Sequence, residues 1–358
     1  MSHSPTVQVA AALGDLSHSW DQLVDTSTSP SPFVRSWWVD GIGAGPGGVL
    51  KIPLVFDDDE LIGGIPLVQD RLAGTLPRLV SIDGSDYVDL VAAPDRELEV
   101  LKTLRRWLAD RRTLVEVVCR SDAAAIDLVP QPRWILARTV APYEELSGSF
   151  DDYLANRTHK WRATVRKSQR ATERRGWTVR LVDPGDIGAS VKRLTQLHRH
   201  QWVNSEFFRL SERFSSAARA GAARGEVVVF ELVDGDVTLA SQVWFEVAGC
   251  SYAYQTGRVP EAASAGIVLF AAAIERACGT GQRRVSFLGG DEAYKAHWAS
   301  QAKNVFRVRG TTGRLLPYLA GAIASRRGYV PWREGTSPAM APWPPDPVSA
   351  STTPTVET

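Results

Sequence analysis

The order of segments between residues 226 and 300 constrains the fold of this chain more than any other sequence feature. Three alternating or apolar runs, EVVVFELVDG, DVTLASQVWFEVAG and CSYAYQTGRV, are separated by DGD and AGC. Such runs with glycine-containing turns between them predict an antiparallel β-meander. An apolar helix flanked by glycines (264–281), a buried strand (283–290) and a short polar-aromatic helix (291–300) come next. The alternation predicts a mixed α/β unit.

The rest of the chain predicts further strands and helices. The 358 residues suit two domains at about 150 residues each. Periodicity and turn residues predict, in order, a hairpin at 49–70, a helix at 95–110, a buried strand at 113–119, one long helix at 150–175, a strand at 177–182, and helices at 187–202 and 205–224. We therefore predict an N-terminal lobe at 1–147, a C-terminal lobe at 148–330 and a proline-dense, disordered tail at 331–358.

Composition excludes several classes of protein. The net charge is +1, hydrophobic residues make up 44% and charged residues 23%, as in ordinary globular proteins. Three scattered cysteines and the lack of a metal-ligand motif argue against a disulfide framework and a bound metal. No apolar run reaches the ~18 residues of a membrane span, and the N-terminus does not resemble a signal peptide. We therefore expect a cytoplasmic protein without membrane insertion.

The segment from Ala155 to Trp177 concentrates positive charge, with eight Lys or Arg residues against one acid. On a helix, a stripe of arginines recurs every fourth residue, at Arg162, Arg166, Arg170 and Arg174. A thin face of Trp161, Val165, Ser168 and Thr172 would dock the helix on a core. Three interpretations stay open: a solvated face, a clamp for an anion, and a nucleic-acid patch. The neutral overall charge disfavours binding to DNA or to nucleic acid in general.

The segment FLGGDEAYKAHWA places four chemically useful side chains at helical spacing. Asp291, Tyr294, Lys295 and Trp298 fall at i, i+3, i+4 and i+7, on one face of a helix. Lys295 is suited to stabilise an oxyanion, Asp291 to accept an amine proton and Tyr294 to protonate a leaving group. The alternative is structural: Asp291 caps the helix and pairs with Lys295, while the two rings pack in the core.

Two further segments carry candidates. The loop GRVPEAASAG joins a strand to a helix N-terminus, where free N–H groups suit the pyrophosphate of a nucleotide-like cofactor, although such a connection is also an ordinary turn. The segment LTQLHRHQW brings His198 and Trp202 next to a buried stripe, where a histidine is either structural or functional.

Taken together, these segments resemble the BioF2-like acetyltransferase family, which includes the CelD proteins. The resemblance rests on RTHKWRATVRKSQRATERRGW, LTQLHRHQW, the meander, SAGIVLFAAAIERA and VSFLGGDEAYKAHWA, and it covers most of the chain. That family belongs to the GNAT acyltransferase superfamily and is related to the FemAB peptidyltransferases. The usual GNAT pyrophosphate loop, Arg/Gln-x-x-Gly-x-Gly/Ala, is present only in a degenerate form with Arg258 and Gly266.

The resemblance implies two GNAT-like lobes, each a mostly antiparallel mixed sheet flanked by helices. It implies an N-acyltransferase, with acetyl-CoA or another acyl-CoA as co-substrate and an amine of a small molecule or of a saccharide or peptide precursor as acceptor. The alternatives are a FemAB-like aminoacyltransferase that uses aminoacyl-tRNA and a non-catalytic GNAT-fold protein that binds an anion. The candidate residues are catalytic Asp291, Tyr294 and Lys295; substrate-binding His198, Trp202, Tyr254, Trp298, Arg162 and Arg166; and cofactor-binding Arg258, Ala265 and Gly266.

Overall fold

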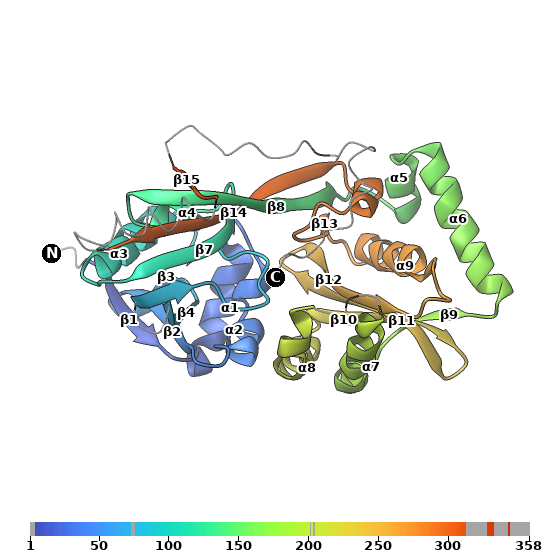
Figure 1. The fold of residues 1–358 in the computed structure, drawn as a ribbon, viewed down its shortest axis with the longest axis horizontal. Helices are drawn as coiled ribbons and strands as arrows, with labels where there is room; N and C mark the ends of the chain where they lie inside the picture. Colours follow the sequence, from blue (N-terminus) through green and yellow to red (C-terminus); the bar gives the residue numbers. More distant parts are fainter. Residues whose placement is uncertain are drawn as a thin grey trace. The chain divides into compact units, whose positions relative to one another are not determined.

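The computed structural model describes residues 4–72, 76–200, 202, 205–312, 328–332 and 343. The chain forms two compact units (Figure 1). The described residues of the first unit are those up to 138, 206–221, 304–312 and 328–332; the second unit takes 139–205, 222–303 and 343. The predicted disordered tail lies almost wholly outside the described residues.

The first unit is a mixed sheet with helices. Its elements are β1 (Thr6–Ala10), η1 (Gly14–Leu16), α1 (Ser17–Thr26), η2 (Pro32–Val34), α2 (Ser36–Ile42), β2 (Val49–Asp57), β3 (Glu60–Gly64), β4 (Leu67–Leu72), β5 (Leu76–Val80), β6 (Val91–Ala92), α3 (Glu97–Ala109), β7 (Leu114–Arg120), α4 (Ala125–Leu128) and β15 (Val330–Pro331), together with most of α8 (Phe207–Ala223) and parts of β8 (Arg133–Glu145) and β14 (Gln301–Thr311). The predicted hairpin is β2 and β3, which pair antiparallel. The antiparallel pairs β1–β2, β2–β4, β4–β5 and β7–β14 extend it, and α3 connects the parallel pair β5 and β7.

The second unit contains the predicted meander. Its elements are α5 (Phe150–Ala155), α6 (His159–Arg174), β9 (Thr178–Leu181), η3 (Pro184–Asp186), α7 (Ile187–Arg199), β10 (Val227–Asp234), β11 (Val237–Val247), β12 (Cys250–Arg258), α9 (Ala265–Gly279), β13 (Arg284–Ser286) and η4 (Ala293–His297), with the remaining parts of α8, β8 and β14. Strands β10, β11 and β12 pair antiparallel, as the alternating runs predict. Strand β13 joins parallel to β12, and β8 pairs antiparallel with β13.

Helices cover both faces of the meander because its strands are apolar on both sides. Successive side chains of a strand point to opposite faces. Phe230 and Leu232 of β10 share a core with Leu269 and Phe270 of α9, whereas Glu231 faces α7. Figure 1 shows α9 and α7 on opposite sides of β10–β12. Both units thus have the predicted mixed α/β architecture with mostly antiparallel pairing.

A buried acid fixes α7 on the sheet. Glu231 is 0% exposed and accepts hydrogen bonds from Ser190 and Arg193 of α7 and from Arg180 of β9. Burial by itself raises the pKa of Glu231, but these three bonds outweigh it and lower the pKa overall. Breaking a buried pair of this kind typically costs about 3–5 kcal/mol. The position of α7 is therefore firmly set.

The prediction of one helix over 150–175 is wrong. The segment forms α5 and α6, with a break at 156–158. Ser149 and Asp152 form a capping box that starts α5, and the Thr158 side chain accepts from Trp161 N and starts α6. Each helix has its own N-cap, so the chain changes direction between them. The thin docking face is confirmed, because Val165, Ser168 and Thr172 are buried.

Candidate functional site

The candidate site lies where the parallel strands β12 and β13 come apart. They pair at three positions only: Cys250 with Arg284, Ser251 with Val285 and Tyr252 with Ser286. Beyond this ladder, β12 continues along β11 to Arg258 and carries a bulge at Tyr254. Residues 287–290 no longer pair with β12 and continue along β8, with which β13 already pairs: Phe287 N donates to Pro142 O and Gly290 N to Val140 O. We call residues 253–258 the β12 arm and residues 287–290 the β13 arm.

Tyr254, a predicted substrate-binding residue, is the extra residue of the bulge. Its ring stacks on Phe245 with centroids 4.8 Å apart, and it is half-buried. A bulge re-aims one side chain and increases the local twist of the strand. The bulge therefore contributes to the divergence of the two arms.

Lys295 is attached to the β13 arm. Its side chain is 7% exposed, and Nζ donates to Gly289 O at 2.8 Å and contacts Glu292 Oε2 at 2.9 Å. Gly290 has φ +134°, and a Cβ on it would lie 2.5 Å from Nζ and 2.1 Å from Glu292 Oε2. A glycine is thus required beside the ammonium group. Two of the three Nζ protons have acceptors here, which leaves one for a developing oxyanion.

The prediction that Asp291, Tyr294, Lys295 and Trp298 share one face of an α-helix is wrong. The segment forms the short 3-10 helix η4, and Asp291 precedes it. Side chains i and i+3 eclipse in such a helix, so Lys295 and Trp298 both point into the unit, whereas Tyr294 and Asp291 are exposed. The predicted Asp291–Lys295 pair is wrong as well, because the carboxylate beside Lys295 is that of Glu292. No side-chain bond caps η4.

Tyr294 and Trp298 differ in what they offer a substrate. Tyr294 is 41% exposed, and burial of the phenol group, followed by the carboxylate of Glu292, raises its pKa. It therefore keeps its proton at neutral pH. Trp298 is 1% exposed and packs on Phe270 and Trp161, so burial makes it a core residue rather than a substrate contact.

Further hydrogen bonds hold η4 in place. Glu144 of β8 accepts from Ser300 N and Oγ, both at 2.7 Å, and pairs with Arg157. Tyr153 of α5 donates to Trp298 O at 2.5 Å. The segment that carries Lys295 is consequently tied to β8 and α5.

His198 is attached to the β12 arm. It lies in the last turn of α7, and its Nδ1 is 2.7 Å from Thr256 O. A carbonyl only accepts, so we assign the proton to Nδ1, and Nε2 then accepts from Ser205 Oγ at 2.8 Å. Burial lowers the pKa of His198, and the bond to Thr256 offsets this in part. The imidazole is thus neutral at neutral pH, with a hydroxyl on its basic nitrogen.

Close packing brings His198 to the arm. A Cβ on Gly257 would lie 2.5 Å from His198 N, so only glycine lets α7 approach β12 so closely. Trp202 stacks near the imidazole with centroids 6.2 Å apart and is 48% exposed. The structure therefore brings His198 and Trp202 together, as their spacing suggests, on the β12 arm.

The loop before α9 offers less than its sequence suggests. The N–H groups of Ala265, Ile267 and Val268 all have backbone acceptors in the preceding turn. The N–H of Gly266 has none within the described part of the chain, and a Cβ on this residue would meet nothing within 4 Å. Ala265 is buried, and Arg258 donates to the carbonyls of Val259 and Pro260. Arg258 and Gly266 can contact an anion, but no multiple N–H cradle is present here.

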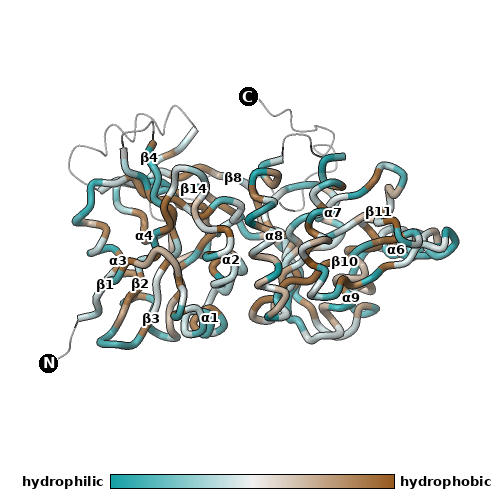
Figure 2. The backbone as a smooth tube through the Cα atoms, turned by 90° about the horizontal axis from the view of Figure 1, so that it is seen from below, coloured by the Kyte–Doolittle hydropathy of each residue, from teal (hydrophilic) through white to brown (hydrophobic). Residues whose placement is uncertain are grey.

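The arginines of the basic helix α6 differ in their surroundings. Arg162 donates to Ala155 O and Arg157 O and so satisfies carbonyls at the end of α5. Arg166, Arg170 and Arg174 are exposed, and we find no acidic partner for them among the described residues. Figure 2 shows that α6 is hydrophilic along most of its length, whereas β10 is largely hydrophobic. Arg162 therefore has a structural task, whereas Arg166 faces solvent.

Sequence reasoning missed Ser205 and Glu292. Ser205 comes after α7 in the chain, and only the folded chain brings it to His198. Glu292 stands three residues before Lys295, which is a spacing typical of ion pairs in helices. That spacing was available in the sequence.

The described residues contain no group of three or more His, Cys, Asp or Glu side chains placed to hold a metal ion. Nor does any helix in these residues combine the length and the hydropathy needed to cross a bilayer.

A meander, a helical crossover and a parallel strand that diverges define the second unit as a GNAT-type fold. Residues 159–296, less than half of the chain, match the sequence model of the family described as "Acetyltransferase (GNAT) domain". Among curated proteins, none matches the chain significantly.

Solved structures agree on the fold. A structure titled "Crystal structure of FemX" superposes with a TM-score of 0.59 at 12% identity and covers 81% of this chain and 95% of its own. A conserved protein of unknown function from Bacteroides thetaiotaomicron gives 0.57 at 9% identity, covering 86% and 100%. L-PGS from Bacillus licheniformis gives 0.51 at 12% identity, covering 80% and 90%. At such low identities these likenesses concern the fold alone.

Proposed function

We propose that the protein is an N-acyltransferase whose reaction centre lies between the β12 arm and the β13 arm. The observation that carries the proposal is the end of the β12–β13 ladder after three pairs, inside the segment that matches the GNAT domain. One arm holds a lysine ammonium group and the other a neutral imidazole. Acyl transfer needs a cation for the oxyanion and a base for the amine proton.

The proposed reaction transfers an acyl group from a thioester to an amine. The amine nitrogen attacks the carbonyl carbon, a C–N bond forms, and the C–S bond then breaks. Lys295 stabilises the oxyanion of the tetrahedral intermediate. His198 accepts the amine proton through the hydroxyl of Ser205, and Tyr294 gives a proton to the leaving thiolate. Asp291, which is exposed beside η4, relays a proton through water in the alternative path.

Acyl-CoA is the proposed donor. Gly266, whose N–H has no acceptor among the described residues, and Arg258 would contact its phosphates. The acceptor is proposed to be an amine of a small molecule or of a saccharide or peptide precursor. A BioF2-like or CelD-type subfamily and a cytoplasmic location belong to the same proposal.

Aminoacyl-tRNA is the second candidate donor, and one observation favours it. Arg166, Arg170 and Arg174 form an exposed stripe on α6, and we find no acidic partner for them in the described residues. A stripe of this kind suits a phosphate backbone, and binding would weaken steeply as salt increases. Substitution of these arginines would then reduce both the affinity and its salt dependence.

A donor screen with the full chain tests the proposal. Acetyl-CoA, longer acyl-CoAs and charged tRNA are offered with a panel of amines, and product is detected by mass spectrometry. Lys295→Ala is expected to lower turnover about 10²–10³-fold, as removal of an oxyanion donor does. Asp291→Asn tests the alternative proton path, and Lys192→Met, at an exposed position of α7, is the matched control.

Each outcome distinguishes the candidates. Turnover with acyl-CoA supports the first donor, and turnover with charged tRNA alone supports the second. Near-wild-type turnover in Lys295→Ala and Asp291→Asn overturns the site. Ligand binding without turnover of any donor favours a non-catalytic protein that binds an anion.

A further inference from the structure

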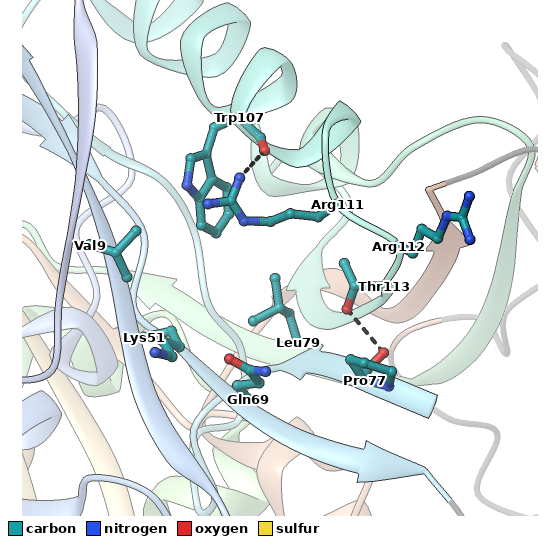
Figure 3. Close-up of a pocket in the computed structure, with 9 residues that line it drawn as sticks. All are labelled: Val9, Lys51, Gln69, Pro77, Leu79, Trp107, Arg111, Arg112 and Thr113. Carbon is teal, nitrogen blue, oxygen red and sulfur yellow. Dashed lines mark hydrogen bonds between the residues drawn. The ribbon is translucent and has the colours of Figure 1, made fainter. Parts of the chain in front are cut away.

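A cavity in the first unit lies outside the candidate reaction centre. Its volume is about 410 Å³, within the range typical of small-molecule sites. Figure 3 shows the side chains around it. The lining residues are Val9, Lys51, Gln69, Pro77, Leu79, Trp107, Arg111, Arg112 and Thr113.

One face of the sheet forms the floor of this cavity. Gln69 of β4 pairs with Leu79 of β5, and Lys51 of β2 pairs with Leu67, two residues from Gln69. Because side chains two residues apart share a face, Lys51, Gln69 and Leu79 are all on one side. Trp107 in the last turn of α3 and Arg111 just beyond it form the wall (Figure 3).

The charged residues that line the cavity all have the same sign. Lys51, Arg111 and Arg112 are cationic, and none of the nine lining residues is acidic. Gln69 and Thr113 add neutral polar groups, and the Thr113 hydroxyl is already used on Pro77 O at 3.0 Å. A concave surface with cations of one sign concentrates anions.

Arg111 is held in place without an acid. Nη1 donates to Trp107 O at 2.5 Å, and the guanidinium carbon lies 3.9 Å from the centre of the Trp107 ring. Burial lowers the pKa of Arg111, and the nearby Asp110 offsets this only in part. The guanidinium group is therefore oriented in advance, and its other N–H groups have no acceptor among the described residues.

Other arginines of the unit show the contrast. Arg78 binds Asp70, and Arg96 binds Glu99 and Asp57. Those acids raise the pKa values of Arg78 and Arg96. The pKa of Arg111, in contrast, is lowered. Burial therefore affects its charge more than any nearby acid does. An anion in the cavity would supply the missing partner.

We propose that this cavity binds a small molecule that bears a phosphate or carboxylate group. The oxyanion is held between Lys51 and Arg111, with the Gln69 amide as a third donor. Val9, Leu79 and Pro77 contact the carbon part of the ligand. The site is separate from the two arms of the second unit, so it does not depend on acyl transfer.

Isothermal titration calorimetry on the full chain, at low ionic strength and in a buffer without oxyanions, tests this proposal. The probes are pyrophosphate and citrate. We expect saturable binding of at least one probe with a Kd of about 1 mM or lower, and weaker binding as salt is added. Lys51→Met and Arg111→Met are each expected to weaken it about tenfold or more.

Two further variants make the result specific. Arg105→Met removes an exposed cation of α3 outside the cavity and should leave binding unchanged. Gln69→Glu introduces an acid at an exposed lining position with little change in packing, and it should abolish binding while the melting temperature stays near that of the wild type. This variant serves as the test even where Lys51→Met or Arg111→Met fails to fold.

The outcomes also separate the two ligand chemistries. Binding of pyrophosphate alone identifies a phosphate ligand, and binding of citrate alone identifies a carboxylate ligand. No saturable binding of either probe overturns the proposal. Equal affinity in the wild type, Arg111→Met and Gln69→Glu overturns it as well.

Discussion

Each unit contains a parallel pair of strands joined by a helix, and the two pairs end differently. In the first unit, α3 connects β5 to β7, which pair at three positions up to Val80 and Glu116. In the second unit, α9 connects β12 to β13, which also pair at three positions. Both connections thus contain a helix and join equally short ladders, although the first also includes β6, which pairs with β3.

In the first unit, the chain that follows β5 bonds to the end of β7, beyond the ladder. Ser81 Oγ accepts from Val118 N at 3.0 Å, and Val88 N donates to Val118 O at 2.7 Å. Next in the chain, Asp89 accepts from Leu90 N and Ala125 N, and its burial raises its pKa to about 6. In the second unit the β13 arm bonds to β8 instead, and His198 and Lys295 are placed on the two arms. A short parallel ladder thus becomes a candidate site when the following chain turns away from it.

The largest expected effect concerns the base on the β12 arm. His198→Gln should lower kcat about 10²–10⁴-fold, the range typical of general bases. In the wild type, kcat/KM should fall on the acid side with a midpoint below the ordinary value of about 6.5, because burial lowers the pKa of His198. The reason is that protonation removes the acceptor for the amine proton. A pH profile of both proteins checks this.

His200→Gln, at an exposed position two residues further on, is the matched control. Its rate and pH profile should equal those of the wild type. A His198→Gln variant that retains both the rate and the acid limb would show that the imidazole is structural. The two arms would then differ in chemistry, with the β13 arm alone active.

A smaller effect is expected at the glycine of the β13 arm. Gly290→Ala should lower the free energy of unfolding by about 1–3 kcal/mol, because φ is positive and the new Cβ would overlap Lys295 Nζ and Glu292. Turnover per folded molecule should fall too, since Nζ must move. Urea denaturation and a rate assay measure the two effects.

Gly281→Ala separates backbone strain from displacement of the lysine. Gly281 also has positive φ, +74°, but a Cβ there meets nothing within 4 Å. Its cost should be smaller, and turnover should not change. Equal costs and equal rates in the two variants would contradict the packing argument for Gly290.

The smallest effect is expected at Ser81, which bonds to β7 in the first unit. Ser81→Ala removes the acceptor of Val118 N and should cost about 1 kcal/mol of unfolding free energy. Acyl transfer per folded molecule should stay constant. A loss of turnover in this variant would mean that the first unit contributes to the reaction centre, and the contrast between the two units would fail.

Local patterns in the sequence predicted the order of elements in the second unit well. Alternation predicted β10–β12, and apolar content predicted α9, because both depend on neighbours in sequence. The break before Thr158 was missed, since its capping bonds compete with a helical pattern that otherwise continues. The spacing of residues 291–298 also predicts an α-helix, whereas the structure has the 3-10 helix η4, which no side chain caps.

Contacts across the chain could not be read from spacing. Ser205 contacts His198 only after α7 packs on β12. Lys295 pairs with Glu292 and not with Asp291, because the segment forms a 3-10 helix. Likewise, residues 206–221 and 304–312 complete the first unit, although both segments lie in the sequence range predicted for the C-terminal lobe. Such placements depend on tertiary packing rather than on propensity.

The aromatic stack between α6 and η4 has a consequence for mutagenesis. The rings of Trp161 and His297 lie 4.3 Å apart and nearly parallel, and Trp161 also meets the edge of Trp298. The basic helix α6 and the turn that carries Lys295 are thus packed together through these three rings. A substitution that tilts α6 would be transmitted to the ammonium group, so arginine variants of this helix need a structural readout beside every rate. Trp161→Phe, which keeps a ring at this position, is the natural reference for them.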